Sequence, residues 1–173
     1  LHRGEMDLAV TYGPAIDLHV SAQSIGYEDI AVVGPPGSGL AARKRVDLDW
    51  LLKQKLIVPS KAHGLRTLLE KSVARRKATL KALIEVDSYR AQISLMEEGL
   101  GYTLLPASAI RAELAAKRLE MAVLFNPTIA RELILATPAA SAPSIATTAV
   151  STAIMSEIEQ LSEGGRWNIK MSR

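Results

Sequence analysis

The chain has 173 residues, of which 48% are apolar and 23% charged, so its composition supports a packed core and excludes wholesale disorder. The absence of cysteine excludes a disulfide framework and a thiolate metal site and fits a reducing cytoplasm, and no apolar run is long enough to predict a transmembrane span. A net charge of +3, from 21 basic and 18 acidic residues, is weak evidence for a polyanionic partner.

Short apolar runs that predict buried strands alternate with segments of helical apolar spacing. In chain order, the expected strands are Met6–Tyr12, Ile30–Gly34, Leu56–Val58, Ala82–Val86, Tyr102–Leu105, Met121–Phe125 and Arg131–Thr137. The expected helices are a short one after Asp47, residues 65–77, a segment from Asp87 or Ser88 to Gly99, Ala107–Lys117, and about Ser144–Leu161. This alternation predicts an α/β fold with a parallel or mixed sheet that is covered on both faces.

Two extended runs, Tyr27–Gly34 and Met121–Pro127, enclose a self-contained set of strands and helices. Two such crossings are typical of the hinge of a two-lobed binding protein. The predicted division is residues 1–28 for part of lobe I, 29–123 for lobe II, 124–163 for the return to lobe I with its C-terminal helix, and 164–173 for a loose tail. Lobe I is expected to be incomplete.

Polar side chains follow two of the predicted strands at their carboxyl ends. In open α/β sheets ligands bind beyond this edge, where helix N-termini favour anions. The candidate ligand-binding residues there are Pro59, Ser60, Lys61, His63, Arg66, Asp87 and Ser88. A simpler interpretation makes Asp87 and Ser88 helix caps only and Arg66 a solvated helix residue.

Three further candidates lie outside this edge. Thr11 and Gly13 end the first predicted strand of lobe I, although Gly13-Pro14 also fits a plain turn. Pro127 lies at the second crossing.

The chain carries no recognisable catalytic or cofactor motif. Ser60 and His63 have no third group to orient them, and the glycines of "GSG" and "GLG" belong to no nucleotide-binding motif. The histidines are not spaced as metal ligands. We therefore expect no enzyme activity, no metal and no cofactor. The basic clusters Arg43–Arg45 and Arg75–Lys77 fit solvated faces, with contact to DNA or a partner subunit as the alternative.

Six fragments in order, "GEMDLAV", "VVGPPGSGLA", "LIVPSKAHGLR", "EVDS", "EEGLGYTLLP" and "ARELILAT", resemble the effector-binding domain of LysR-type transcriptional regulators. The resemblance runs from Gly4 to about Leu161. It implies a periplasmic-binding-protein-like fold of two Rossmann-like lobes, with a small effector in the cleft between them. It also implies a cytoplasmic bacterial regulator without a membrane partner, a homodimer or homotetramer that binds DNA through a winged helix-turn-helix.

This sequence departs from that pattern because it lacks both the winged helix-turn-helix and the first strand–helix–strand of lobe I. We therefore expect a truncated regulator with a small anionic effector. Two other classes remain open: a solute-binding protein for uptake of a small anionic metabolite, which would share the fold, and a small α/β enzyme.

Overall fold

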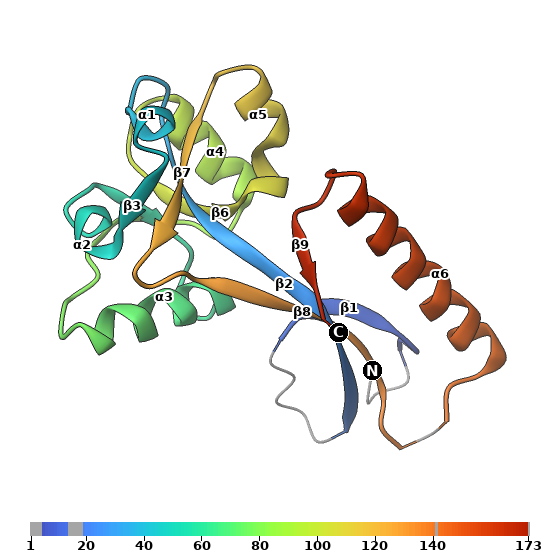
Figure 1. The fold of residues 1–173 in the computed structure, drawn as a ribbon. Helices are drawn as coiled ribbons and strands as arrows, with labels where there is room; N and C mark the ends of the chain where they lie inside the picture. The colour runs from blue at the N-terminus through green and yellow to red at the C-terminus, as the bar shows by residue number, and fades with distance from the viewer. Residues whose placement is uncertain (1–4, 14–18, 141, 173) are drawn as a thin grey trace. The chain divides into compact units, whose positions relative to one another are not determined.

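The structure is a computed structural model that describes residues 5–13, 19–140 and 142–172. It divides into two compact units: unit 1 comprises Leu1–Glu28 and Ala130–Arg173, and unit 2 comprises Asp29–Ile129. The chain passes between the units twice (Figure 1). The first passage lies within the long strand β2 (Val20–Gly34), and the second lies between β7 (Glu120–Phe125) and β8 (Ala130–Pro138).

Unit 2 is built on a mixed sheet. The second half of β2 pairs antiparallel with β6 (Thr103–Pro106) and β7, and β3 (Arg45–Asp47) runs parallel to β7. Strands β4 (Leu56–Val58) and β5 (Ala82–Glu85) form a parallel pair. Two backbone hydrogen bonds of Tyr102, to Lys55 and Ile57, join β4 to the start of β6 in parallel register. The parallel strands β4 and β5 therefore end at the same edge.

Helices cover both faces of this sheet, as the sequence predicts. They are α1 (Leu40–Arg43), α2 (Leu48–Leu51), α3 (Gly64–Arg75), α4 (Tyr89–Glu97), the 3₁₀ turn η1 (Ala107–Ile110) and α5 (Arg111–Ala115). Because side chains alternate along a strand, Val32 packs in one apolar cluster with Leu69 of α3. Its neighbour Val33 packs in a second cluster with Met96 of α4.

Unit 1 has the strand order β1–β8–β2–β9, with β1 at Ala9–Tyr12 and β9 at Ile169–Met171. The helix α6 (Ile145–Glu163) buries Ile158 in a cluster with strand residues that include Leu135 and Ile169. The prediction of a loose tail is wrong for 169–171, which pair antiparallel with Gly26–Glu28. A side chain at Gly26 would meet the Lys170 carbonyl oxygen at 2.6 Å, so glycine admits this close strand.

Within the described residues, no helix combines the length and the apolar character needed to cross a membrane.

Candidate functional site

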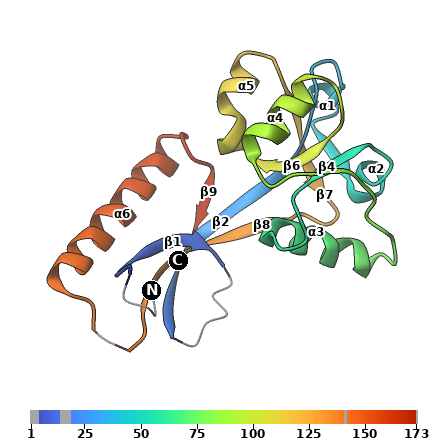
Figure 2. The same ribbon diagram turned by 180° about the vertical axis from the view of Figure 1, so that it is seen from behind.

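The loops that follow β4 and β5 are tied together at the edge where both strands end. The Ser60 backbone N–H donates to Oδ1 of Asp87 at 2.8 Å, and the Val86 N–H donates to the Val58 carbonyl at 3.0 Å. Helices α3 and α4 begin directly after these loops (Figure 2). We call this surface the β4–β5 edge; it consists of Ser60, Lys61, His63, Asp87, Ser88 and Tyr89.

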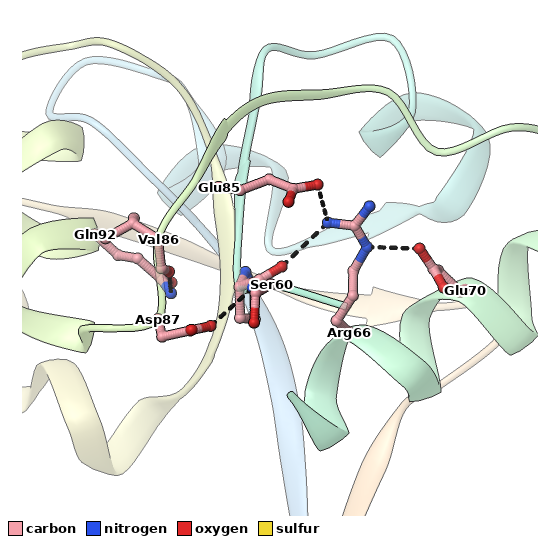
Figure 3. Close-up of polar contacts among 8 residues, drawn as sticks. Ser60, Arg66, Glu70, Glu85, Val86, Asp87 and Gln92 are labelled. Atoms are coloured by element: carbon pink, nitrogen blue, oxygen red, sulfur yellow. Dashed lines mark hydrogen bonds and ion pairs between the residues drawn. The ribbon is translucent and has the colours of Figure 1, made fainter. Parts of the chain in front are cut away.

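Asp87 links the two loops instead of capping a helix. Its carboxylate reaches across to Ser60 (Figure 3). The cap of α4 is Ser88, whose hydroxyl oxygen accepts the Ala91 N–H at 3.4 Å. The pKa of Asp87 is lowered from its ordinary value of 3.8, chiefly by the hydrogen bond from the Ser60 backbone N–H. Asp87 therefore presents a negative charge at the edge at neutral pH.

His63 caps α3. Its Nδ1 accepts the Leu65 backbone N–H at 3.2 Å, so this nitrogen is occupied within the chain. The imidazole lies 6.3 Å from the ring of Tyr89, centroid to centroid, which places an aromatic side chain at the start of each helix. Tyr89 is absent from the residues that the sequence predicts for the site. The exposed Lys61 adds a cation beside them.

Arg66 is buried and internally paired, so its interpretation as a solvated helix residue is wrong. Its side chain is 4% exposed. Its Nε donates to Glu70 at 2.8 Å, and its Nη1 donates to the Pro59 carbonyl at 3.1 Å and to Glu85 at 3.2 Å (Figure 3). Arg66 thus joins α3, the loop after β4 and strand β5. These contacts hold the loop after β4 in place and so support the β4–β5 edge.

A second buried group supports the loop after β5. Gln92 of α4 has no exposed surface; its Nε2 donates to the Val86 carbonyl at 2.8 Å, and its Oε1 accepts the Thr103 hydroxyl at 3.0 Å. Sequence reasoning missed this residue. The available signal was an amide immediately before Ile93 and four residues before Met96, on the apolar side of the predicted helix.

The three remaining predicted site residues lie in or follow other strands. Thr11 and Gly13 belong to unit 1, where Thr11 is exposed in β1 and the Gly13 N–H donates to the Glu132 carbonyl at 2.9 Å. Pro127 follows β7 in unit 2, after a cis peptide bond with Asn126. Within unit 2, the structure therefore brings together the candidates that follow β4 and β5.

The glycine-rich loop after β2 is filled by a side chain of the protein. Glu120 accepts the N–H of Gly37 at 2.9 Å, the N–H of Ala41 at 3.1 Å and the hydroxyl of Ser38 at 3.2 Å. These bonds, led by that from Ala41, lower the pKa of Glu120 from its ordinary value of 4.5. The carboxylate occupies the position that an external anion would take.

Two other features bear on ligand chemistry. Among the described residues, no three His, Asp or Glu side chains are arranged to hold a metal ion. A hollow of about 360 Å³ lies in unit 1, lined by Met6–Leu8 and residues near the start of α6. Because it lacks converging charged groups other than Asp7, we favour the β4–β5 edge as the candidate site.

The chain matches a model of a known protein family. The LysR substrate binding domain model matches residues 1–158.

Two curated relatives are regulatory proteins. The nitrogen assimilation regulatory protein nac of Escherichia coli (strain K12) is 27% identical over 169 residues, which cover 95% of this chain and 53% of the relative. The HTH-type transcriptional regulator BbuR of Bordetella bronchiseptica is 27% identical over 95% of this chain and 50% of its own length. The chain spans about half the length of these relatives.

Solved structures of regulatory domains share the fold. The CcmR regulatory domain of Synechocystis PCC6803, in complex with 2-PG, superposes with a TM-score of 0.79 at 19% identity, over 90% of this chain and 74% of that one. The effector binding domain of QuiR, in complex with shikimate, superposes with a TM-score of 0.76 at 21% identity, over 88% of this chain and 71% of that one. These matches confirm the predicted periplasmic-binding-protein-like α/β fold.

Proposed function

The chain belongs to the LysR substrate-binding domain family, and from this premise we propose that it is the effector-binding part of a LysR-type transcriptional regulator. The full regulator would be a cytoplasmic bacterial homodimer or homotetramer that binds DNA through a winged helix-turn-helix. Support comes from the curated relatives, which are regulators about twice as long as the matched region. An uptake protein with the same fold is not favoured, because the named relatives are regulators.

The observation that carries the proposed site is the convergence of two helix starts, of α3 and α4, at the β4–β5 edge. Helix N-termini favour a bound anion, and the exposed Lys61 adds a positive charge. Asp87 requires a hydrogen-bond donor on the ligand, because its ionised carboxylate accepts hydrogen bonds and repels an anion that has no donor. The edge therefore fits a small anionic ligand that also carries hydroxyl donors.

Hydroxylated carboxylates meet this requirement and form the first test set. Shikimate, which the QuiR domain binds, belongs to this class. Such an effector would act by binding more tightly to one conformation of the regulator than to another, since only differential affinity shifts an equilibrium.

The test is a thermal-shift screen of small hydroxy-carboxylates with this chain, followed by calorimetry on single variants. A ligand that binds the folded state raises the melting temperature with its concentration. Lys61→Gln, Ser60→Ala and Ser88→Ala should each weaken binding, and the loss of a charge-assisted hydrogen bond predicts roughly ten- to a hundredfold for Lys61→Gln.

The matched control is Lys117→Gln, which removes another exposed lysine, two residues after the end of α5. It should bind as the parent does. If all three edge variants also retain parental affinity for the identified ligand, the β4–β5 edge is not its site.

A further inference from the structure

Positive charge is concentrated in one stretch of unit 2. Residues 40–81 contain 12 lysines and arginines against 3 aspartates and glutamates, a net charge of +9, whereas the whole chain carries only +3. Two basic triplets account for half of these cations, Arg43–Arg45 beside β3 and Arg75–Lys77 at the C-terminal end of α3.

The fold brings the two triplets together around the end of β7. The Arg45 guanidinium lies over the Phe125 ring, 4.7 Å from its centroid, and the carbonyl of the next residue, Asn126, accepts a hydrogen bond from Arg76. Arg76 also pairs with Asp49 of α2 at 2.9 Å. In both ribbon views α2 and the end of α3 lie on the same side of unit 2 (Figures 1 and 2), and Figure 1 shows β3 on that side too.

We call this surface the basic face; it consists of Arg43, Lys44, Arg45, Arg75, Arg76 and Lys77. Several of its side chains are held in place. Arg43 lies over the Trp50 ring at 5.6 Å, Arg45 lies over Phe125, and Arg76 is bonded to Asp49 and Asn126. Such interactions reduce the conformational entropy that a cation loses when it binds a partner.

A solvated surface explains only part of this arrangement. Cations at the C-terminal end of α3 stabilise the helix dipole, which accounts for Arg75–Lys77. Arg43–Arg45 lie at a four-residue helix and an outer strand of the sheet, where the dipole argument has little force. The face still keeps an excess of positive charge, because Asp49 neutralises one of its six cations, Arg76, and Asp47 is engaged as the cap of α2.

We propose that the basic face binds the phosphodiester backbone of DNA without reading its sequence. A polyanion fits better than an acidic protein, since protein interfaces centre on exposed aromatic or aliphatic anchors. Here the aromatic rings of Trp50 and Phe125 lie under arginines. Val123, the strand partner of Arg45, is an exposed apolar residue on β7. The choice of DNA rests on the proposed function, because a regulator holds its effector domain near DNA and so raises the effective concentration of a weak interaction.

The experiment measures binding of this chain to a fluorescently labelled duplex of random sequence by anisotropy, across a series of salt concentrations. The test variant is Lys44→Gln/Lys77→Gln, which leaves the held arginines in place. The control is Arg90→Gln/Lys117→Gln, which removes the same charge from other exposed positions. Lys77 and Lys117 share a left-handed backbone with φ of 54°, so their substitutions are conformationally matched.

Backbone binding predicts that log affinity falls linearly with log salt, with a slope of about 0.9 for each phosphate that the protein neutralises. The test variant removes two cations, so its slope should be shallower by about 1.8, which corresponds to binding weaker by roughly a hundredfold at about 50 mM salt. The control should match the parent. Equal weakening in both variants would show an effect of net charge alone and overturn the proposal.

Two further results would also overturn it: no duplex binding by the parent chain at low salt, or competition by polyglutamate as effective as that by unlabelled duplex at equal charge. The second would indicate an acidic protein partner. Calorimetry measures effector binding by the test variant separately from DNA binding, because neither substituted lysine belongs to the β4–β5 edge. A failed effector screen therefore counts against the proposed function, and failed DNA binding counts against the basic face.

Discussion

Arg66 should contribute more to the folding stability of unit 2 than an ordinary surface residue at the start of a helix does. Arg66→Ala removes the donor to the Pro59 carbonyl, worth about 1.5 kcal/mol, and two buried methylenes at about 0.8 kcal/mol each. Its carboxylate partners Glu70 and Glu85 are 42% and 47% exposed, so solvent screening reduces each pair to about 0.5 kcal/mol. The expected loss is about 4 kcal/mol for Arg66→Ala and about 2.5 kcal/mol for Arg66→Met, which keeps most of the buried stem.

The assay is urea denaturation followed by tryptophan fluorescence. The chain has two tryptophans, Trp50 in unit 2 and Trp167 in unit 1, so a Trp167→Phe background makes Trp50 the reporter of unit 2. Trp50 packs against the core of that unit, 5.5 Å from the Tyr102 ring in an edge-on arrangement. A loss below about 0.5 kcal/mol for Arg66→Ala, the range of ordinary surface substitutions, would refute a stabilising role for the buried arginine. Equal losses for the two variants would refute the packing contribution alone.

The same assay tests three further predictions. Because the pKa of Glu120 is lowered in the folded state, its ionised carboxylate stabilises the fold above pH 4.5, and this stabilisation is lost as the pH falls through the lowered pKa. Glu120→Gln should therefore lose less stability on acidification than the parent does. Gln92→Leu should cost about 1–3 kcal/mol because it leaves the buried Thr103 hydroxyl without its acceptor, and adding Thr103→Val should recover part of that loss. Gly101→Ala should destabilise unit 2 by about 1–3 kcal/mol, since its Cβ would lie 2.5 Å from a backbone carbonyl oxygen. The control is Gly64→Ala, whose Cβ meets nothing within 4 Å, so it should not lower the stability. Equal urea midpoints for the two variants would contradict the steric argument.

The sequence predicts most accurately where local signals agree. The pattern of residues 85–106 predicts a helix between two strands, and the structure has β5, α4 and β6 there, with Ser88 as the cap and Gly99 at φ of 75°. Capping, apolar spacing and a left-handed glycine are short-range properties, so they can be read without knowing the fold. The order of such segments is also sufficient for the family and its fold class, which the comparisons confirm.

Strands β3 and β9 escape prediction because they contain charged residues and so carry little signal of their own, unlike the equally short but wholly apolar β4. β3 and β9 have three residues each, and they exist because β7 and β2 offer them free backbone groups. β2 begins at Val20, ten residues before the predicted strand, since its first half is mostly polar or exposed. Pairing with distant strands decides such segments, and pairing is a tertiary property.

At the candidate site, the sequence alone determined that Ser60 and Asp87 each follow a strand and precede a helix, and that Arg66 lies in the first turn of α3. Only the tertiary structure decided that Asp87 accepts the Ser60 N–H, and that Arg66 is buried among Pro59, Glu70 and Glu85. The physical reason is that periodicity reports which side of a helix is apolar, whereas the partner of a polar group depends on which strand lies beside it. Arg66 is enclosed by acceptors of its own chain, which satisfy its charge. Its role as a ligand contact stays a prediction.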